Sequence, residues 1–217
     1  MSQAHARRAV AHAYREIARL GLNSGSAGNV SARTRKGMVI TPSGCSATTV
    51  TESGLVAMTL DGATRDDIAP SSEWSMHAGI YEAYPGAGFI IHTHADACTA
   101  LACLNEPLPP FHYMVLDFGG PNVRCAPYVT FGTPELAGLA VTALEDRSAC
   151  LLANHGMIVH GHDAELALRR AVALETLCRQ YLLARQAGTL RLLNAAEIAA
   201  ARERFKNYGP GSKQRAP

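Results

Sequence analysis

The sequence has 217 residues, 47% of them hydrophobic, and a formal net charge of +2 at neutral pH. This length and composition predict one α/β domain over residues 1–217, and the scattered, nearly balanced charge argues against nucleic-acid or anionic-membrane binding. No apolar run approaches the roughly 20 residues that a membrane span needs, and the N-terminus lacks the apolar stretch of a secretion signal. We therefore expect a cytoplasmic protein whose six cysteines are free thiols.

Apolar spacing and turn residues predict the elements of the first half of the chain. We expect, in chain order, a helix over 3–20, a Gly-, Ser- and Asn-rich loop over 22–33, strands over 36–41 and 55–60, a helix that starts at Ser71 and Ser72 and stops at Pro85, and a strand over 88–94.

The same signals predict the second half. We expect a short helix near 96–104, strands over 112–118 and 123–129, a helix from Thr133 to about 144, strands over 149–153 and 157–160, a long helix capped by Asp163 and stopped by Gly188, a helix over 194–205, and a flexible tail over 210–217. Several strands are joined by short turns, which favours a mixed or largely antiparallel sheet with flanking helices.

Two histidines, His92 and His94, stand one residue apart in the stretch IIHTHADA at the end of an apolar strand. Positions i and i+2 of a strand share a face, so both imidazoles can bind one ion. A catalytic zinc has three protein ligands and keeps one position for substrate. Because histidines also occur at strand ends without a metal, the pair by itself leaves both interpretations open.

The better third ligand is His155, which follows an apolar strand and precedes a glycine that allows a sharp turn. A second pair, His160 and His162, has a glycine between its members at a turn, so we interpret both as solvated turn residues. The remaining histidines are assigned to helix faces (His5, His12 and His77) or to a loop, where a contact with substrate stays open (His112).

Ser71 and Ser72 stand at the start of a predicted helix, where hydroxyls, free N–H groups and the helix dipole favour an anion. An ordinary serine N-cap is the alternative. Glu73 follows directly, and a carboxylate beside an anion site calls for a metal partner or a proton-transfer role, unless it only complements the helix dipole. Small residues in the loops 25–29 and 41–44 would let backbone amides approach a phosphate.

These segments occur together in one order. The combination of GSAGNVSAR, ITPSG, PSSEW, HTHADACTA, HYM, CAPYVTFGT and NHG resembles the class II aldolase/adducin family, with greatest similarity to its L-fuculose-1-phosphate aldolases. The resemblance extends from residues 19–29 to residues 205–209. It implies a central, mostly antiparallel sheet with helices on both faces, and a fourfold-symmetric homotetramer whose active sites lie between subunits.

The resemblance also implies roles for single residues. His92, His94 and His155 match the three zinc ligands, and Glu73 matches the acid/base, which can bind the metal when substrate is absent; Mn²⁺ or Co²⁺ are alternative ions. The positions that hold the substrate phosphate are matched by Ser26, Gly28, Asn29, Ser43, Gly44, Ser71 and Ser72. Tyr113 matches a tyrosine that acts from the neighbouring subunit, and Phe131 and Tyr208 match residues on the aldehyde side.

The implied reaction is reversible cleavage of a ketose 1-phosphate to dihydroxyacetone phosphate and a small aldehyde. Zinc would stabilise the enediolate charge, Glu73 would protonate C3, and Tyr113 would exchange the C4 hydroxyl proton. L-Fuculose 1-phosphate and 5-deoxyribulose or 5-methylthioribulose 1-phosphate remain alternatives, since small aldehyde substituents change binding by only ~1–3 kcal/mol. Rival functions are a pentulose-phosphate 4-epimerase, with Asp117 as a candidate extra acid/base, a sugar-phosphate dehydratase, and a non-catalytic adducin-like binding module.

Overall fold

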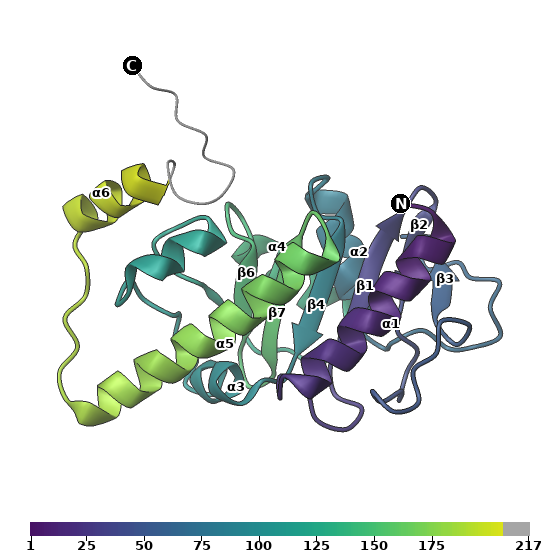
Figure 1. Ribbon diagram of the computed structural model, residues 1–217, viewed down its shortest axis with the longest axis horizontal. Helices are drawn as coiled ribbons and strands as arrows, with labels where there is room; N and C mark the ends of the chain where they lie inside the picture. Colours follow the sequence, from purple (N-terminus) through teal and green to yellow (C-terminus); the bar gives the residue numbers. More distant parts are fainter. Residues whose placement is uncertain (206–217) are drawn as a thin grey trace, which may run out of the picture.

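A computed structural model describes residues 1–205, in which a twisted sheet lies between two groups of helices (Figure 1). Tyr208 and the predicted tail over 210–217 lie outside the described residues. The elements are α1 (Gln3–Arg19), β1 (Asn29–Thr34), β2 (Gly37–Ile40), β3 (Val56–Met58), α2 (Trp74–Ala83), β4 (Phe89–Thr93), α3 (Asp96–Ala102), the 3₁₀ helix η1 (Tyr113–Phe118), β5 (Cys125–Ala126), α4 (Pro134–Ala143), β6 (Ala149–Leu152), β7 (Gly156–Gly161), α5 (Ala164–Ala187) and α6 (Ala195–Phe205).

In this part of the chain the sheet has seven strands in the order β3-β2-β1-β4-β7-β6-β5. Every neighbouring pair is antiparallel except β5 and β6, which are parallel. The predicted mixed, mostly antiparallel sheet is therefore confirmed. Because β4 lies between β1 and β7, the residues at its end are next to the start of β1 and to the β6–β7 turn.

Each face of the sheet has its own apolar core. Ile91 of β4 packs in a buried cluster with Leu174 of α5 and with α1 and α3, whereas Ile90 packs in a second cluster with Met76 of α2 and with α4. Figure 1 shows α1 and α5 on one side of the sheet and α2 and α4 on the other, which confirms helices on both faces. Burying an Ile, Leu or Met side chain contributes about 1.5–3 kcal/mol. By strand alternation, His92 faces the α2 side.

The strand predicted over 112–118 is wrong, because Tyr113–Phe118 forms the 3₁₀ helix η1. The His112 side chain caps this helix and accepts the Met114 N–H at 3.2 Å. The two buried residues of the segment, Val115 and Phe118, are three positions apart. That spacing is the period of a 3₁₀ helix and not the alternation of a strand.

The loop predicted over 22–33 is wrong in its second part, which contains β1. Val30 and Ala32 of this strand are fully buried, and β1 pairs with β2 on one side and with β4 on the other. Small and polar residues have low strand propensity, but the two partner strands supply the hydrogen bonds that hold this segment extended.

Three further bounds differ from the prediction. Helix α2 begins at Trp74, with Glu73 at its N-cap, so Ser71 and Ser72 precede the helix; Ser71 Oγ accepts the Glu73 N–H at 3.3 Å. The strand predicted over 123–129 is reduced to Cys125–Ala126, because the next residue is a proline, which has no N–H for the ladder. The strand predicted over 55–60 is likewise shortened to Val56–Met58.

All six cysteines are free thiols, as predicted. Among the helices of residues 1–205, none has both the length and the apolar character needed to cross a membrane.

Candidate metal centre and substrate cavity

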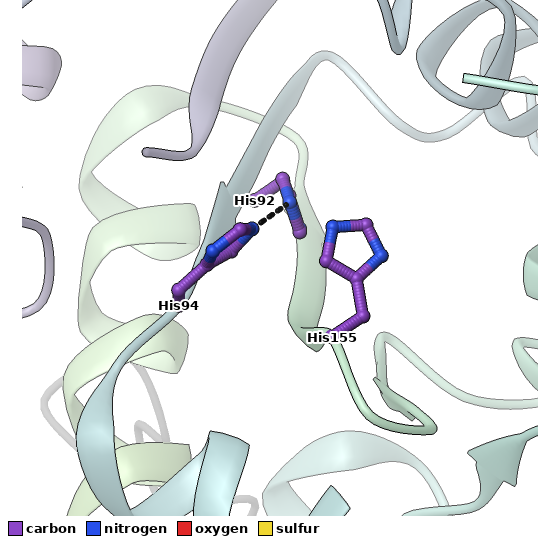
Figure 2. A group of neighbouring side chains, drawn as sticks. All are labelled: His92, His94 and His155. Atoms are coloured by element: carbon purple, nitrogen blue, oxygen red, sulfur yellow. Dashed lines mark hydrogen bonds between the residues drawn. The ribbon is translucent and has the colours of Figure 1, made fainter. Parts of the chain in front are cut away.

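Three imidazole rings converge on one point near the end of β4 (Figure 2). His92 lies on β4, His94 directly after it, and His155 in the turn between β6 and β7. One nitrogen from each ring lies within 4.8 Å of the others. The structure thus brings together the three histidines that the sequence singled out as metal ligands.

The β6–β7 turn can approach β4 because of two residues beside His155. Asn154 has a left-handed φ of 53°, which asparagine tolerates better than most residues. At Gly156, an added Cβ would lie 2.4 Å from the Thr93 carbonyl oxygen and 3.1 Å from the His94 ring. Only glycine fits at this position, so the short segment Asn-His-Gly delivers the third imidazole.

The orientation of His92 is set from the sheet. Its Nδ1–H donates to the Met157 carbonyl at 2.8 Å, which leaves Nε2 with a lone pair directed at His94 Nε2, 3.1 Å away. A backbone carbonyl that fixes one ring nitrogen is the usual support of a metal-binding histidine. Two ligands on a tetrahedral zinc are about 3.3 Å apart for metal–nitrogen bonds of ~2.0–2.1 Å, so the observed separation matches.

Glu73 closes the site from the α2 side and is only 5% exposed. Its Oε2 lies 3.1 Å from His92 Nε2 and accepts a hydrogen bond from Asn29 Nδ2 at 2.9 Å. Its Oε1 lies 3.2 Å from His155 Nε2, yet makes no hydrogen bond to any described residue. A buried carboxylate oxygen without a hydrogen bond next to imidazole lone pairs is the arrangement that a divalent cation would satisfy.

Protonation favours metal binding at neutral pH. Burial, with the nearby His92 ring, lowers the pKa of His94 to about 4, and burial likewise lowers the pKa of His155 to about 4. For Glu73, burial by itself raises the pKa, but the His92 and His155 imidazoles and the Asn29 amide hold it well below its usual range. Neutral imidazoles and an ionised carboxylate are the forms that bind metal.

The donor set of three imidazole nitrogens and one carboxylate fits zinc and also the neighbouring divalent transition metals. The set contains no thiolate, so it does not suit the soft metals that prefer thiolate-rich sites.

A cavity of about 310 Å³ adjoins the three histidines. Its lining includes all seven residues predicted for the phosphate, two of the three predicted metal ligands, Glu73 and one residue predicted for the aldehyde side: Ser26, Gly28, Asn29, Ser43, Gly44, Ser71, Ser72, His94, His155, Glu73 and Phe131. Tyr128, Val129 and Asn154 line it as well, and the sequence reasoning missed them. Tyr128 and Val129 belong to the same CAPYVTFGT segment as Phe131, so the motif was the signal that could have found them.

The serine- and glycine-rich part of the lining offers donors for an anion. Among residues 1–205, the backbone N–H groups of Gly44 and Ser72 have no hydrogen-bond partner. Ser72 also directly precedes Glu73, the N-cap of α2, and the dipole of this helix favours negative charge at its N-terminus. Free amides of this kind are available to phosphate oxygens.

Several residues considered from the sequence lie elsewhere in the same chain. Tyr113 lines a separate apolar cavity between η1 and α6, together with His112. Asp117 is bound by Arg169 at 2.7 Å and lines neither of these two cavities.

The interpretation of the second histidine pair is wrong for one member. His160 lies within β7, is partly buried, and stacks on Tyr84 with ring centroids 5.7 Å apart. His162 is exposed and lies 3.1 Å from Asp163.

His77 is a residue of the site that the sequence reasoning assigned only to a helix face. It is fully buried, and its Nε2 lies 2.5 Å from Asn29 Oδ1. The available signal was its spacing, since His77 follows Glu73 by four positions, one helical turn away.

The sequence matches the family described as Class II Aldolase and Adducin N-terminal domain over residues 8–182. The chain belongs to this family. Its relatives include a 5-methylthioribulose-1-phosphate/5-deoxyribulose-1-phosphate aldolase from Rhodospirillum rubrum, 43% identical over 205 residues, which cover 94% of this chain and 93% of that protein. An L-fuculose phosphate aldolase from Escherichia coli K12 is 43% identical over 195 residues, 89% of this chain and 91% of the relative.

A solved structure named L-fuculose 1-phosphate aldolase superimposes on this class II aldolase with a TM-score of 0.90 and 36% identity. The match covers 95% of this chain and 98% of that chain. The fold and the relatives together make the protein an enzyme, an aldolase of the carbon–carbon lyase class.

Proposed function

We propose that this class II aldolase reversibly cleaves a ketose 1-phosphate to dihydroxyacetone phosphate and a small aldehyde. The observation that carries the proposal is the position of Glu73, between three converging imidazoles and a cavity with a serine- and glycine-rich lining. That arrangement sets a proton-transfer group, a metal site and a phosphate site side by side. The names of the relatives support the substrate class, since both act on phosphorylated sugars.

His92, His94 and His155 are the proposed ligands of one zinc ion, and Glu73 is a fourth ligand when substrate is absent. Bound there, zinc supplies Lewis-acid polarisation of substrate oxygens. The buried Glu73 Oε1 without a hydrogen bond supports this assignment.

Each protein group has a defined task in this proposal. Glu73 delivers a proton to C3 after cleavage and removes it in the reverse direction. The backbone and hydroxyl donors of the cavity bind the phosphate and orient the carbon chain, and such positioning lowers the barrier by itself. The residues that supply these donors are Ser26, Gly28, Asn29, Ser43, Gly44, Ser71 and Ser72.

In this proposal, Tyr113 of a neighbouring subunit takes and returns the proton of the C4 hydroxyl. The active form is then an oligomer, which we propose to be a fourfold-symmetric tetramer. Tyr113 lines a different cavity of its own chain from the one beside Glu73, which agrees with a role in trans. Phe131, more than half exposed at the cavity, fits the aldehyde side. Tyr208 stays a prediction for the same pocket.

The metal requirement is tested by chelation. Treatment with a chelator should abolish cleavage of a ketose 1-phosphate, and stoichiometric Zn²⁺ should restore it, with Mn²⁺ and Co²⁺ as comparisons. Calcium serves as the control, because three imidazoles do not suit a cation that prefers oxygen ligands. Cleavage that survives complete metal removal would contradict the zinc proposal.

The substrate is tested with a panel. We expect release of dihydroxyacetone phosphate from L-fuculose 1-phosphate, 5-deoxyribulose 1-phosphate or 5-methylthioribulose 1-phosphate, with kcat/KM deciding the preferred aldehyde. L-Ribulose 5-phosphate belongs in the same panel as the test of the epimerase, and water loss without carbon–carbon cleavage would identify a dehydratase. The epimerase gains no support from Asp117, which is engaged by Arg169.

A further inference from the structure

A continuous chain of buried hydrogen bonds runs from Glu73 into the protein interior. Asn29 Nδ2 lies 2.9 Å from Glu73 Oε2, and Asn29 Oδ1 lies 2.5 Å from His77 Nε2. His77 Nδ1 is 2.7 Å from Ser31 Oγ, which is 2.8 Å from the Tyr81 hydroxyl. Each of these five residues is at most 5% exposed.

The donor and acceptor groups of these side chains allow only one direction for the series of hydrogen bonds. The Glu73 carboxylate only accepts, so the Asn29 amide nitrogen must donate to it, and the Asn29 oxygen must then accept from His77 Nε2–H. Burial lowers the pKa of His77 to about 3, so its ring is neutral and Nδ1 accepts the Ser31 hydroxyl. Tyr81 in turn donates to Ser31. Every donor therefore points toward Glu73.

We propose that His77 is a positioning residue of the aldolase, which fixes the Asn29 amide so that its N–H side faces Glu73 and holds the carboxylate between His92 and His155. The inference rests on the proposed function in taking Glu73 as the acid/base. It also revises the role of Asn29, whose carboxamide is engaged on both sides and supports Glu73 as much as it can contact a phosphate.

The hydrogen-bonded side chains come from one strand and one helix, which explains why the support is rigid. Asn29 and Ser31 lie on β1, on the same face, two positions apart. His77 and Tyr81 lie on α2, one turn apart. His77 thus ties the helix that begins beside Glu73 to the strand that neighbours His92. Without the His77 donor, the Asn29 oxygen would be a buried unsatisfied acceptor, and the amide could turn its oxygen toward the carboxylate.

Two carboxamide variants separate positioning from packing. In His77→Gln the amide N–H can take the place of Nε2–H and donate to Asn29, whereas the shorter His77→Asn reaches Ser31 but not Asn29. A third variant, Met76→Ala, removes a neighbouring buried side chain of α2 that is outside the hydrogen-bond chain. For all three variants we would measure KM, and kcat per mole of bound zinc. We would also determine crystal structures of the metal-free forms.

The expected result is a kcat about 10–100-fold lower in His77→Asn, with His77→Gln within about 3-fold of the wild type, as for other residues that orient a metal-site group. KM should change less than about 3-fold in both, since the other six residues of the proposed phosphate site are untouched. Met76→Ala should lower the melting temperature but leave kcat per bound zinc unchanged. In the crystals, the bond between Asn29 and Glu73 should be kept in His77→Gln and lost in His77→Asn.

Equal kcat values in the two His77 variants, or an unmoved Asn29–Glu73 pair in His77→Asn, would overturn the proposal. If the wild type cleaved none of the ketose phosphates, the proposed function would fail by itself. The crystallographic comparison would still decide whether His77 positions Glu73, because it depends on neither substrate nor metal.

Discussion

Gly25 and Gly28 stand in the loop before β1, and both have a left-handed φ, 61° and 70° respectively. Their surroundings differ. A Cβ added at Gly25 meets nothing within 4 Å, whereas one at Gly28 would lie 2.6 Å from the His92 carbonyl oxygen and 2.8 Å from Asn23 Oδ1. Gly28 is therefore required by the close approach to the His92 backbone as well as by its own conformation.

This difference predicts unequal costs of the same substitution. Gly25→Ala should lower the free energy of unfolding by about 1 kcal/mol, the cost of a left-handed alanine. Gly28→Ala should cost about 3 kcal/mol, because overpacking adds to that strain, and it should weaken metal binding by displacing His92. Urea unfolding and zinc titration measure the two effects. Equal losses in both variants would show that the contact with His92 is unimportant.

A second residue-scale prediction concerns Glu73. Glu73→Gln keeps the shape and the contact with Asn29, but it removes the proton-transferring carboxylate. We expect kcat to fall by about 10²–10⁴-fold, while the three histidines still bind zinc. Metal analysis and cleavage assays on the same sample check both parts. A variant that retains most of its activity would contradict the acid/base role.

At the scale of elements, α3 begins two residues after His94, and its start is held by another helix. The buried Glu175 of α5 accepts the backbone N–H groups of Ala97 and Cys98, at 3.0 and 2.9 Å. Arg179 lies 3.3 Å from the same carboxylate but is largely exposed, so this ion pair adds little. Glu175 thus supplies, from another helix of the same chain, the side-chain cap that the N-cap residue of α3 does not provide.

Removing this cap should destabilise the fold. Glu175→Ala leaves two buried N–H groups without a partner and should lower the free energy of unfolding by about 3 kcal/mol or more. Glu175→Gln keeps one acceptor and should cost less. The exposed Glu165→Ala, on the first turn of the same helix, is the control and should stay within about 0.5–1 kcal/mol. Denaturant unfolding of the three variants gives the comparison, and a loss for Glu175→Ala no larger than for Glu165→Ala would refute the capping role.

At the scale of the whole molecule, the buried neutral His77 makes stability depend on pH. Its pKa is about 3 in the folded protein against an ordinary value of 6.5, so below pH 6.5 the unfolded chain binds a proton that the folded chain excludes. The contribution of the neutral His77 to the free energy of unfolding is complete above pH 6.5 and is lost as the pH falls toward 3.

When the pH falls from 7.5 to 5, the free energy of unfolding of the metal-free wild type should therefore decrease by about 2 kcal/mol more than that of His77→Gln. Urea unfolding at the two pH values measures this difference. His5→Gln changes an exposed histidine of α1 and should leave the wild-type pH dependence in place. A parallel pH dependence in the wild type and His77→Gln would contradict a neutral, buried His77.

The proposed sharing of active sites between subunits predicts complementation. Glu73→Gln and Tyr113→Phe should each be nearly inactive alone. When they are unfolded together and reassembled, about a quarter of the sites would combine an intact Glu73 with an intact Tyr113 from the neighbour, by random mixing in a closed ring. Recovery of activity, with a tetramer seen by ultracentrifugation, checks the prediction. No recovery in mixed oligomers would exclude action in trans.

Much of the fold was predictable because long segments with periodic apolar residues indicate their secondary structure directly. Helices α1, α4 and α5 and strands β4, β6 and β7 follow the apolar spacing and the caps of the sequence closely. The errors fall where tertiary contacts override local preference. β1 is strand because it lies between two partners, and η1 is a helix because its buried residues are three apart. The tetramer, the cytoplasmic location and the roles of Tyr113 and Tyr208 stay predictions.

The sequence by itself determined which residue types were available for chemistry: the histidine pair on β4, the Asn-His-Gly turn and the Ser-Ser-Glu segment, because metal binding and anion binding need those groups in short, recognisable spacings. Only the tertiary structure decided how they are held. The bonds from Asn29 to Glu73 and from His77 to Asn29 join residues 44 and 48 positions apart. No local pattern encodes such a contact, since it depends on how α2 packs against β1.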